Sequence, residues 1–241
     1  EVQSLLESPR RPIVLLKKHH PDDFPEWSAT GTIGVFLPYT PLHVLLLDGS
    51  AGGPDTLIFT SANRPGEPVL IENEDAVEAL AGIADGYLLH DRPIVNRCDD
   101  SVLRLWRGSP VFFRRSRGYA PQPVLLPFDA TGVIAFGAEQ KASFAAGREQ
   151  HAFLSQHIGD LKNTAVLDHY RSALETYLRL FRIHPAVLIC DRHPDYFSTR
   201  EAQETAQRLS VPLLRVQHHW AHLCACLADN RFSGPAFGIV W

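Results

Sequence analysis

The feature that most constrains the fold is a cluster of prolines near the middle of the chain. Pro121, Pro123 and Pro127 lie within seven residues. Proline cannot continue the interior of a helix or a central strand, so we expect a break here. The 241 residues are enough for two domains. We therefore predict domains at residues 1–120 and 132–241, joined by a proline-rich linker at 121–131.

Hydrophobic periodicity predicts strands and helices in both parts. Expected strands are residues 13–16, 56–60, 133–136, 186–190, 211–216 and 237–241, with a hairpin formed by 101–106 and 111–116. Expected helices are 41–47, 73–81 with Asn73 as its cap, 163–182, one opened by a Ser198–Glu201 capping box, and 218–228. Alternating strands and helices in the second part predict an α/β fold with a parallel or mixed sheet.

Composition excludes several classes of protein. Hydrophobic residues are 45% and charged residues 21%, which is ordinary for a globular protein. Apolar runs such as 44–47 are far shorter than the about 20 residues that a membrane span needs. Four cysteines without a C-x-x-C pair fit a reducing cytoplasm. Because the chain lacks methionine and stops within an apolar run, we expect it to be an internal piece of a longer protein.

The charge distribution argues against general nucleic-acid binding. Residues 1–125 carry 12 Lys and Arg against 16 Asp and Glu, a net charge of −4. Residues 126–241 carry 11 of each, a net charge of 0. Neither half has the basic excess that binding to a phosphate backbone requires.

The sharpest motif is a histidine cluster at residues 218–222. On a helix, His218 and His222 are four positions apart, so both imidazoles lie on one face. Two histidines at that spacing are typical of half a metal site, and a third ligand must come from elsewhere. The alternative is a polar helix start with incidental histidines. Asp191, at the end of a predicted strand, could bind a metal, orient a histidine or only cap a turn.

Further polar residues include candidate contacts for phosphate or a carbamoyl-like group. Thr60, Ser61 and Asn63 follow an apolar run, although a simple polar turn would have the same composition. Arg115 and Arg117 follow the predicted hairpin, and guanidinium forks bind phosphate, but they also guard solvated edge strands. Asp99, Asp100 and Ser101 could hold these arginines, meet Mg²⁺ or form a turn; Lys141, in a loop after a strand, is a weaker candidate.

Taken together, these segments resemble the HypF-type carbamoyltransferases that mature [NiFe]-hydrogenases. Residues 39–43, 60–68, 84–92, 99–102 and 114–118 resemble that family's YrdC-like domain. Residues 137–141, 154–161, 191–199 and 216–222 resemble the first part of its actin/Hsp70-type kinase-like domain. The resemblance therefore implies a mixed α+β YrdC-like domain followed by part of an α/β kinase-like domain.

The resemblance also implies a reaction and a set of residues. The family uses carbamoyl phosphate and ATP, with Mg²⁺, to form carbamoyl-adenylate, and passes the carbamoyl group to the C-terminal cysteine of a HypE-type acceptor protein. The implied roles are phosphate neutralisation for Arg115 and Arg117, nucleotide or carbamoyl binding for Thr60, Ser61, Asn63, Ser101 and Lys141, and binding of a divalent metal, Zn or Fe, for His218 and His222.

Departures from the family leave other functions open. The acylphosphatase domain and the C-x-x-C zinc motifs of the family are absent. We expect the 241-residue chain alone to be inactive, because its metal site lacks a ligand and its nucleotide sites are incomplete. A related enzyme that carbamoylates a small-molecule hydroxyl would share the 60–63 loop and the paired histidines. More distant alternatives are a threonylcarbamoyl-adenylate enzyme for tRNA modification and a YrdC-like module that binds double-stranded RNA.

Overall fold

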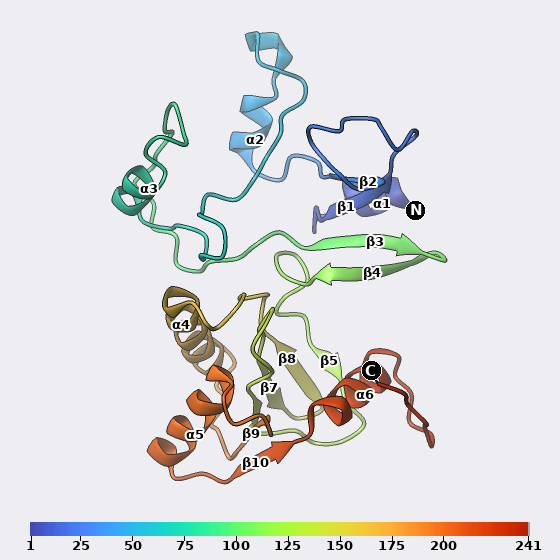
Figure 1. The fold of residues 1–241 in the computed structure, drawn as a ribbon, viewed down its shortest axis with the longest axis vertical. Helices are drawn as coiled ribbons and strands as arrows, with labels where there is room; N and C mark the ends of the chain where they lie inside the picture. Colours follow the sequence, from blue (N-terminus) through green and yellow to red (C-terminus); the bar gives the residue numbers. More distant parts are fainter. Residues whose placement is uncertain (241) are drawn as a thin grey trace. The chain divides into compact units, whose positions relative to one another are not determined.

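A computed structural model describes residues 1–240 of the chain, in two compact units (Figure 1). The first unit comprises residues 1–61 and 98–119. The second comprises residues 62–97 and continues from residue 120. None of the helices among the described residues combines the length and the apolar character needed to cross a membrane.

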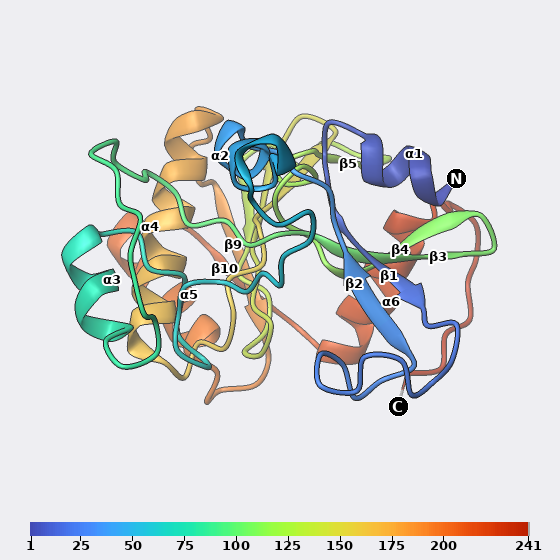
Figure 2. The same cartoon turned by 90° about the horizontal axis from the view of Figure 1, so that it is seen from above.

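The first unit is built on a four-stranded mixed sheet with the order β2-β1-β3-β4 (Figure 2). β1 pairs with β2 antiparallel and with β3 parallel. The predicted hairpin is present as β3–β4, with its second strand two residues earlier than predicted. A small core of Val14, Leu103 and Tyr119 lies against the sheet. The elements are α1 (Val2–Glu7), β1 (Ile13–Lys17), β2 (Thr32–Val35), α2 (Pro41–Leu46), the 3-10 turn η1 (Gly49–Ala51), β3 (Val102–Trp106) and β4 (Ser109–Arg114).

The second unit contains a six-stranded mixed sheet with the order β10-β9-β6-β7-β8-β5. β10, β9 and β6 are parallel, and the other pairings are antiparallel. The elements are α3 (Asn73–Ala79), β5 (Val124–Leu125), β6 (Val133–Ala135), β7 (Ala145–Arg148), β8 (His151–Leu154), α4 (Thr164–Leu180), β9 (Val187–Asp191), α5 (Phe197–Leu209), β10 (Leu213–Val216) and α6 (His218–Asp229). The predicted α/β class is confirmed for this unit.

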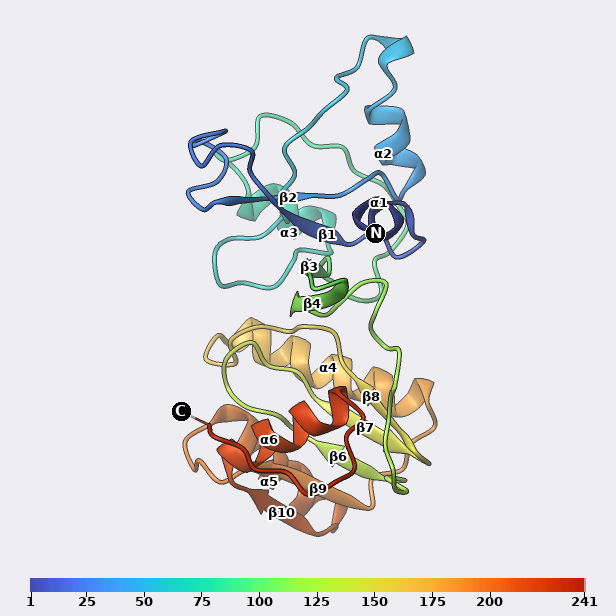
Figure 3. The same ribbon diagram turned by 90° about the vertical axis from the view of Figure 1, so that its right-hand side faces the viewer.

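Helices cover this sheet on both faces. α4 and α5 supply the buried residues that pack on Ile134 and Leu188. α6 lies on the opposite face, on the viewer's side of the sheet in Figure 3. Because successive strand residues point to opposite faces, Ile134 and Leu188 face the core while Ala135 and Ile189 face α6.

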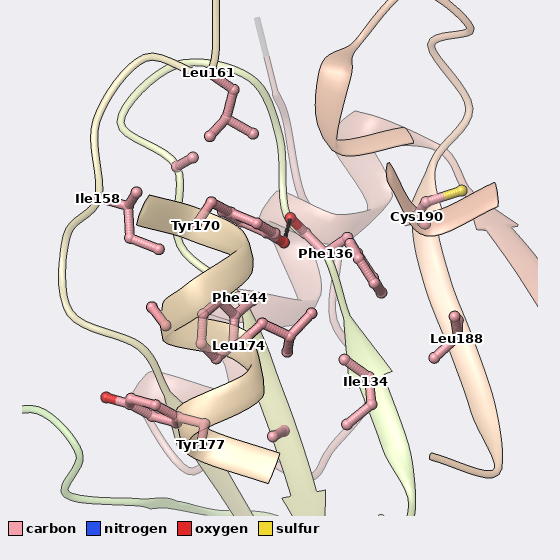
Figure 4. Packing of buried hydrophobic residues seen from close by; sticks show 14 of the residues in the cluster. Ile134, Phe136, Phe144, Ile158, Leu161, Tyr170, Leu174, Tyr177, Leu188 and Cys190 are labelled. Atoms are coloured by element: carbon pink, nitrogen blue, oxygen red, sulfur yellow. Dashed lines mark hydrogen bonds between the residues drawn. The ribbon is translucent and has the colours of Figure 1, made fainter. Parts of the chain in front are cut away.

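The core of the second unit is centred on Tyr170 of α4 (Figure 4). Tyr170 is fully buried, and its ring lies edge-on to Phe144. Its hydroxyl donates a hydrogen bond of 2.7 Å to the carbonyl of Phe136. This bond satisfies a buried acceptor just after β6, and burial raises the pKa of the phenol well above its ordinary value.

We expect Tyr170→Phe to lower the free energy of unfolding by about 1–2 kcal/mol. The ring is kept, but the buried Phe136 carbonyl loses its donor, and an unsatisfied buried acceptor costs that much. Urea unfolding measures the loss. Tyr87→Phe is the matched control, because Tyr87 is exposed and its bond to the Val77 carbonyl is 3.3 Å. Equal losses for both variants would contradict the role given to Tyr170.

Two predicted strands are wrong. Residues 56–60 form no strand, and Ile58 in that run is 70% exposed. Residues 237–240 also form no strand, and Phe237 is 91% exposed; Trp241 lies outside the described residues. An apolar run is compatible with a strand, but a ladder also needs a partner, and the pattern within the run carries no information on that partner.

Two predicted helix caps are also wrong. Asn73 lies inside α3, and its amide donates to the carbonyl of His90. α5 has no capping box, because Ser198 lies inside the helix and its hydroxyl donates to the carbonyl of Gly137. The carboxylate that accepts a hydrogen bond from the first turn of α5 belongs to Glu139, 58 positions before Phe197. Such a distant cap has no local sequence signal.

Candidate functional site

The paired histidines lie at the carboxyl ends of two parallel strands. β9 ends at Asp191 and β10 ends at Val216, and these two residues are directly paired in the sheet. α6 begins two residues after Val216, and the side chain of Gln217 caps it by accepting from the Trp220 N–H. This topology brings His218 beside Asp191, which is 27 positions earlier in the chain.

The side chains of Asp191, His218 and His222 form a connected row. Asp191 Oδ2 is 2.6 Å from His218 Nδ1, and His218 Nε2 is 3.0 Å from His222 Nε2. The Asp191 side chain is 8% exposed and that of His218 is 37% exposed. The expectation that both imidazoles share one helix face is confirmed. Of the roles considered for Asp191, the structure supports orienting a histidine.

The donor set fits part of a metal site. Two imidazole nitrogens facing each other at 3.0 Å can share one ion, since a Zn–N bond is about 2.0–2.1 Å. A carboxylate on the other nitrogen of a ligating histidine is the usual supporting contact. Within residues 1–240, no group of three or more His, Cys, Asp or Glu side chains is gathered for metal binding. The pair offers two nitrogen donors, and the metal assignment stays a prediction.

Two cavities in the second unit meet at the histidine pair. The first, of about 570 Å³, lies between α6 and the sheet and is lined mostly by apolar side chains, with Asp191, His218 and His222 at one side. Cys190 also lines it, and burial raises the pKa of this thiol, so it stays protonated near neutral pH.

The second cavity, of about 550 Å³, is polar. His218 and His222 again contribute, together with Gln140, Lys162 and Asp195. His193 and Tyr196 form one wall, with their rings stacked at a centroid distance of 4.2 Å. Amide, ammonium and imidazole donors next to a histidine pair can bind the oxygens of a phosphate or a carbonyl.

The lysine at this cavity is not the one that the sequence indicated. Lys141 is exposed in the loop after β6 and is not among the residues that line either cavity. Lys162 lines the polar cavity, one position before the Asn163 cap of α4. No local sequence signal marks Lys162 as a cavity residue, because its place there depends on where α4 begins.

Arg117 and Asp100 in the first unit form an ion pair, one of the three alternatives left open for Asp99–Ser101. Arg117 Nε is 2.6 Å from Asp100 Oδ1, and its other two nitrogens donate to the carbonyls of Arg10 and Arg11. The guanidinium carbon also lies 3.5 Å from the centre of the Tyr39 ring. Burial, followed by the charge of Asp100, raises the pKa of Tyr39. A guanidinium with this many contacts is favoured as a structural element over a phosphate clamp.

Ser101 and Arg115 lie next to this pair. Ser101 is fully buried; its hydroxyl donates to the carbonyl of Arg117 and accepts from the Ser116 N–H. This geometry favours a structural role for Ser101. Arg115 follows β4 directly and is partly buried.

The residues of the 60–63 loop are largely exposed. Thr60 and Ser61 are exposed at the end of the segment assigned to the first unit. Asn63 closes a turn through its amide nitrogen, which donates to the carbonyls of Arg64 and Glu67. Its Oδ1 is buried and has no hydrogen-bond partner among the described residues. The turn is therefore present, and the nucleotide or carbamoyl roles of these residues stay predictions.

Two family models match the chain, one in its first half and one in its second. Residues 2–116 match a family model described as telomere recombination, of the Sua5, YciO and YrdC type. Residues 129–229 match a family model described as the HypF Kae1-like domain.

Curated relatives match almost the whole chain. Carbamoyltransferase HypF2 of Cupriavidus necator is 42% identical over 98% of this chain and 32% of its own length. Carbamoyltransferase HypF of Rhizobium leguminosarum bv. viciae is 42% identical over 99% of this chain and 32% of its own length. A probable carbamoyltransferase HypF of Methanocaldococcus jannaschii is 39% identical over 97% of this chain and 31% of its own length. The chain thus spans about a third of the length of these relatives.

Two solved structures are similar in fold. One is a full-length HypF, described as the phosphate- and nucleotide-bound form, with a TM-score of 0.81 and 41% sequence identity. The match covers 95% of this chain and 36% of the HypF chain. The other is HypF of T. kodakarensis, with a TM-score of 0.85 and 39% sequence identity. The match covers 94% of this chain and 30% of the T. kodakarensis chain.

Proposed function

Because the chain belongs to the HypF family of carbamoyltransferases, we propose that it supplies the nucleotide-binding and carbamoyl-transfer parts of an ATP-dependent carbamoyltransferase. The observation that carries this proposal is the histidine pair, held by Asp191 at the meeting point of two cavities, within a segment about 40% identical to HypF proteins. The reaction would join carbamate, released from carbamoyl phosphate, to ATP as carbamoyl-adenylate, and then transfer the carbamoyl group to a thiol.

The polar cavity supports nucleotide or carbamoyl-adenylate binding. Lys162 and Gln140 are placed to donate to phosphate or carbamoyl oxygens, and the stacked His193–Tyr196 pair offers a flat wall. One solved relative is described as phosphate- and nucleotide-bound, which agrees with ATP, with its Mg²⁺, as the cofactor. In the first unit, Arg115 remains the candidate for phosphate neutralisation, because the contacts of Arg117 are already structural.

His218 and His222 fit a divalent cation, Zn²⁺ or Fe²⁺. When bound, such an ion supplies positive charge that polarises a carbonyl or phosphoryl oxygen. The chain's own contribution is to keep both Nε2 atoms on one side of α6 and to hold the ring of His218 through Asp191. We propose the C-terminal cysteine of a HypE-type protein as the acceptor and the cytoplasm as the location, where the chain's four free thiols are stable.

We expect the full-length product of the gene to release pyrophosphate from ATP only when carbamoyl phosphate is present. Adenylate formation consumes the carbamoyl donor and ATP together, so omission of either removes the product. The measurement is pyrophosphate release with carbamoyl phosphate, with threonine plus bicarbonate, and with neither. Dependence on threonine and bicarbonate would contradict the proposal in favour of tRNA modification, and release under no condition would contradict adenylate chemistry.

The second arm of this experiment tests the acceptor step. His222→Ala is expected to retain pyrophosphate release and to lose carbamoylation of a cysteine-terminated acceptor, measured as a mass increase on the thiol. His184→Ala is the matched control, because His184 is exposed and lines neither cavity. Transfer to a small-molecule hydroxyl in place of the thiol would move the assignment to the O-carbamoyltransferase class.

A further inference from the structure

We propose that Asp191 is a positioning residue that sets the tautomer of His218. Through the same carboxylate it also holds the turn at His193, which forms part of the wall of the polar cavity. The consequence for metal binding rests on the proposed function, whereas the tautomer itself does not. Each of its two carboxylate oxygens has one partner: Oδ2 contacts His218 Nδ1 at 2.6 Å, and Oδ1 accepts from the backbone N–H of His193 at 2.8 Å.

The first contact decides which nitrogen of His218 carries the proton. A carboxylate can only accept, so Nδ1 of His218 must be the N–H donor. In the neutral ring, the other nitrogen, Nε2, then has a lone pair on the side of His222 Nε2, 3.0 Å away. An imidazole nitrogen that is to bind a metal or accept a proton needs that lone pair. Asp191 therefore presents the useful nitrogen of His218 to the point where both cavities meet.

The second contact places the polar wall. Oδ1 holds the turn after β9 at His193, and within that turn the Asp195 N–H donates to His193 Nδ1 at 3.3 Å. His193 accepts through Nδ1 and so carries its proton on Nε2, while its ring stacks on Tyr196. The Asp191 side chain is 8% exposed, so solvent competes little with either contact. One buried carboxylate thus fixes the histidine pair and the adjacent wall together.

Asp191→Asn tests this directly because it keeps the shape of the side chain. If the Asn oxygen continues to accept from the His193 N–H, its NH₂ group faces His218 Nδ1 and must donate to it. His218 is then expected to change to the Nε2–H tautomer, which puts a proton on the nitrogen that faces His222. The change is measured on the metal-free 241-residue chain by two-bond ¹⁵N–¹H correlation of labelled histidine. An unchanged Nδ1–H tautomer in Asp191→Asn would overturn the proposal.

Asp195→Asn is the matched control. Asp195 lines the same polar cavity, but its side chain is 75% exposed and its ion pair is with Arg200. Among the described residues, its side chain makes no hydrogen bond or ion pair with His218, so its substitution should leave the tautomer in its wild-type form. A tautomer change of equal size in both variants would overturn the specific role of Asp191 and point to a general effect of cavity charge.

Metal affinity gives the second readout. In competition with a chromophoric chelator, we expect Asp191→Asn to bind Zn²⁺ about 10–100-fold more weakly than the wild type, the usual effect of losing the partner of a ligating histidine. Equal affinity would overturn the positioning role at the metal. If His222→Ala does not weaken Zn²⁺ binding by the full-length protein, the proposed metal function fails, and the tautomer experiment still decides the role of Asp191. Far-UV circular dichroism of each variant separates both results from unfolding.

Discussion

Arg117→Ala is expected to lower the free energy of unfolding by about 3 kcal/mol. The substitution removes a charge-assisted hydrogen bond to Asp100 and two further bonds to the carbonyls of Arg10 and Arg11. Hydrogen bonds to charged groups contribute about 1.5–3 kcal/mol each, and their sum is reduced here because the pair is about a quarter exposed to water. The stacking of the guanidinium on Tyr39 is lost as well.

The location of the loss identifies its cause. Arg117 joins the end of the β4 segment to the residues before β1, so amide hydrogen exchange should accelerate in β1 and β3 and remain unchanged in β9. Arg117→Lys keeps the charge but lacks the planar fork, and should recover less than half of the loss. Arg107→Ala is the control, because Arg107 lies exposed in the hairpin turn, and should cost less than about 0.5 kcal/mol. Equal losses for Arg117→Ala and Arg107→Ala would contradict this account.

Local patterns predicted most helices and strands well. The helix expected at 163–182 is α4 at Thr164–Leu180, and Asn163 is its N-cap. Tyr170, Leu174 and Tyr177 of this helix are buried, because the 3.6-residue period places them on one face. The failures at 56–60 and at the start of α5 have a common cause. A strand partner and the Glu139 cap both depend on residues far away in the sequence.

The same distinction applies to the candidate site. The spacing of His218 and His222 predicted their shared face, because only one helix is involved. The contact of His218 with Asp191 depends on the pairing of β9 with β10. The sequence allowed this role for Asp191 but could not distinguish it from metal binding or from capping a turn. Lys162 was missed for the same reason, since its place at the polar cavity depends on where α4 begins relative to the loop after β6.

Gly137→Ala is expected to cost about 3 kcal/mol or more of unfolding free energy and to disturb both cavities. Gly137 ends the segment after β6 with a φ of +69°, and a Cβ at this position would lie 2.2 Å from the carbonyl oxygen of Ser143. The Ser143 oxygen belongs to the backbone, so the conflict is relieved only by moving the loop that carries Ala138, which lines both cavities. The Gly137 carbonyl also accepts from the buried Ser198 hydroxyl of α5, so that contact would move too.

Gly66→Ala separates the steric conflict from backbone strain. Gly66 has a φ of +80°, but a Cβ there would meet nothing within 4 Å. Its substitution should therefore cost only the left-handed strain, about 1–2 kcal/mol. The difference between the two variants in urea unfolding then measures the collision with Ser143. The same variants titrated with Zn²⁺ should show weaker binding for Gly137→Ala alone, because only that loop lies beside His218 and His222. Equal stability losses, or unchanged metal affinity in Gly137→Ala, would show that the loop after β6 adapts to a side chain and that the cavities do not depend on its backbone geometry.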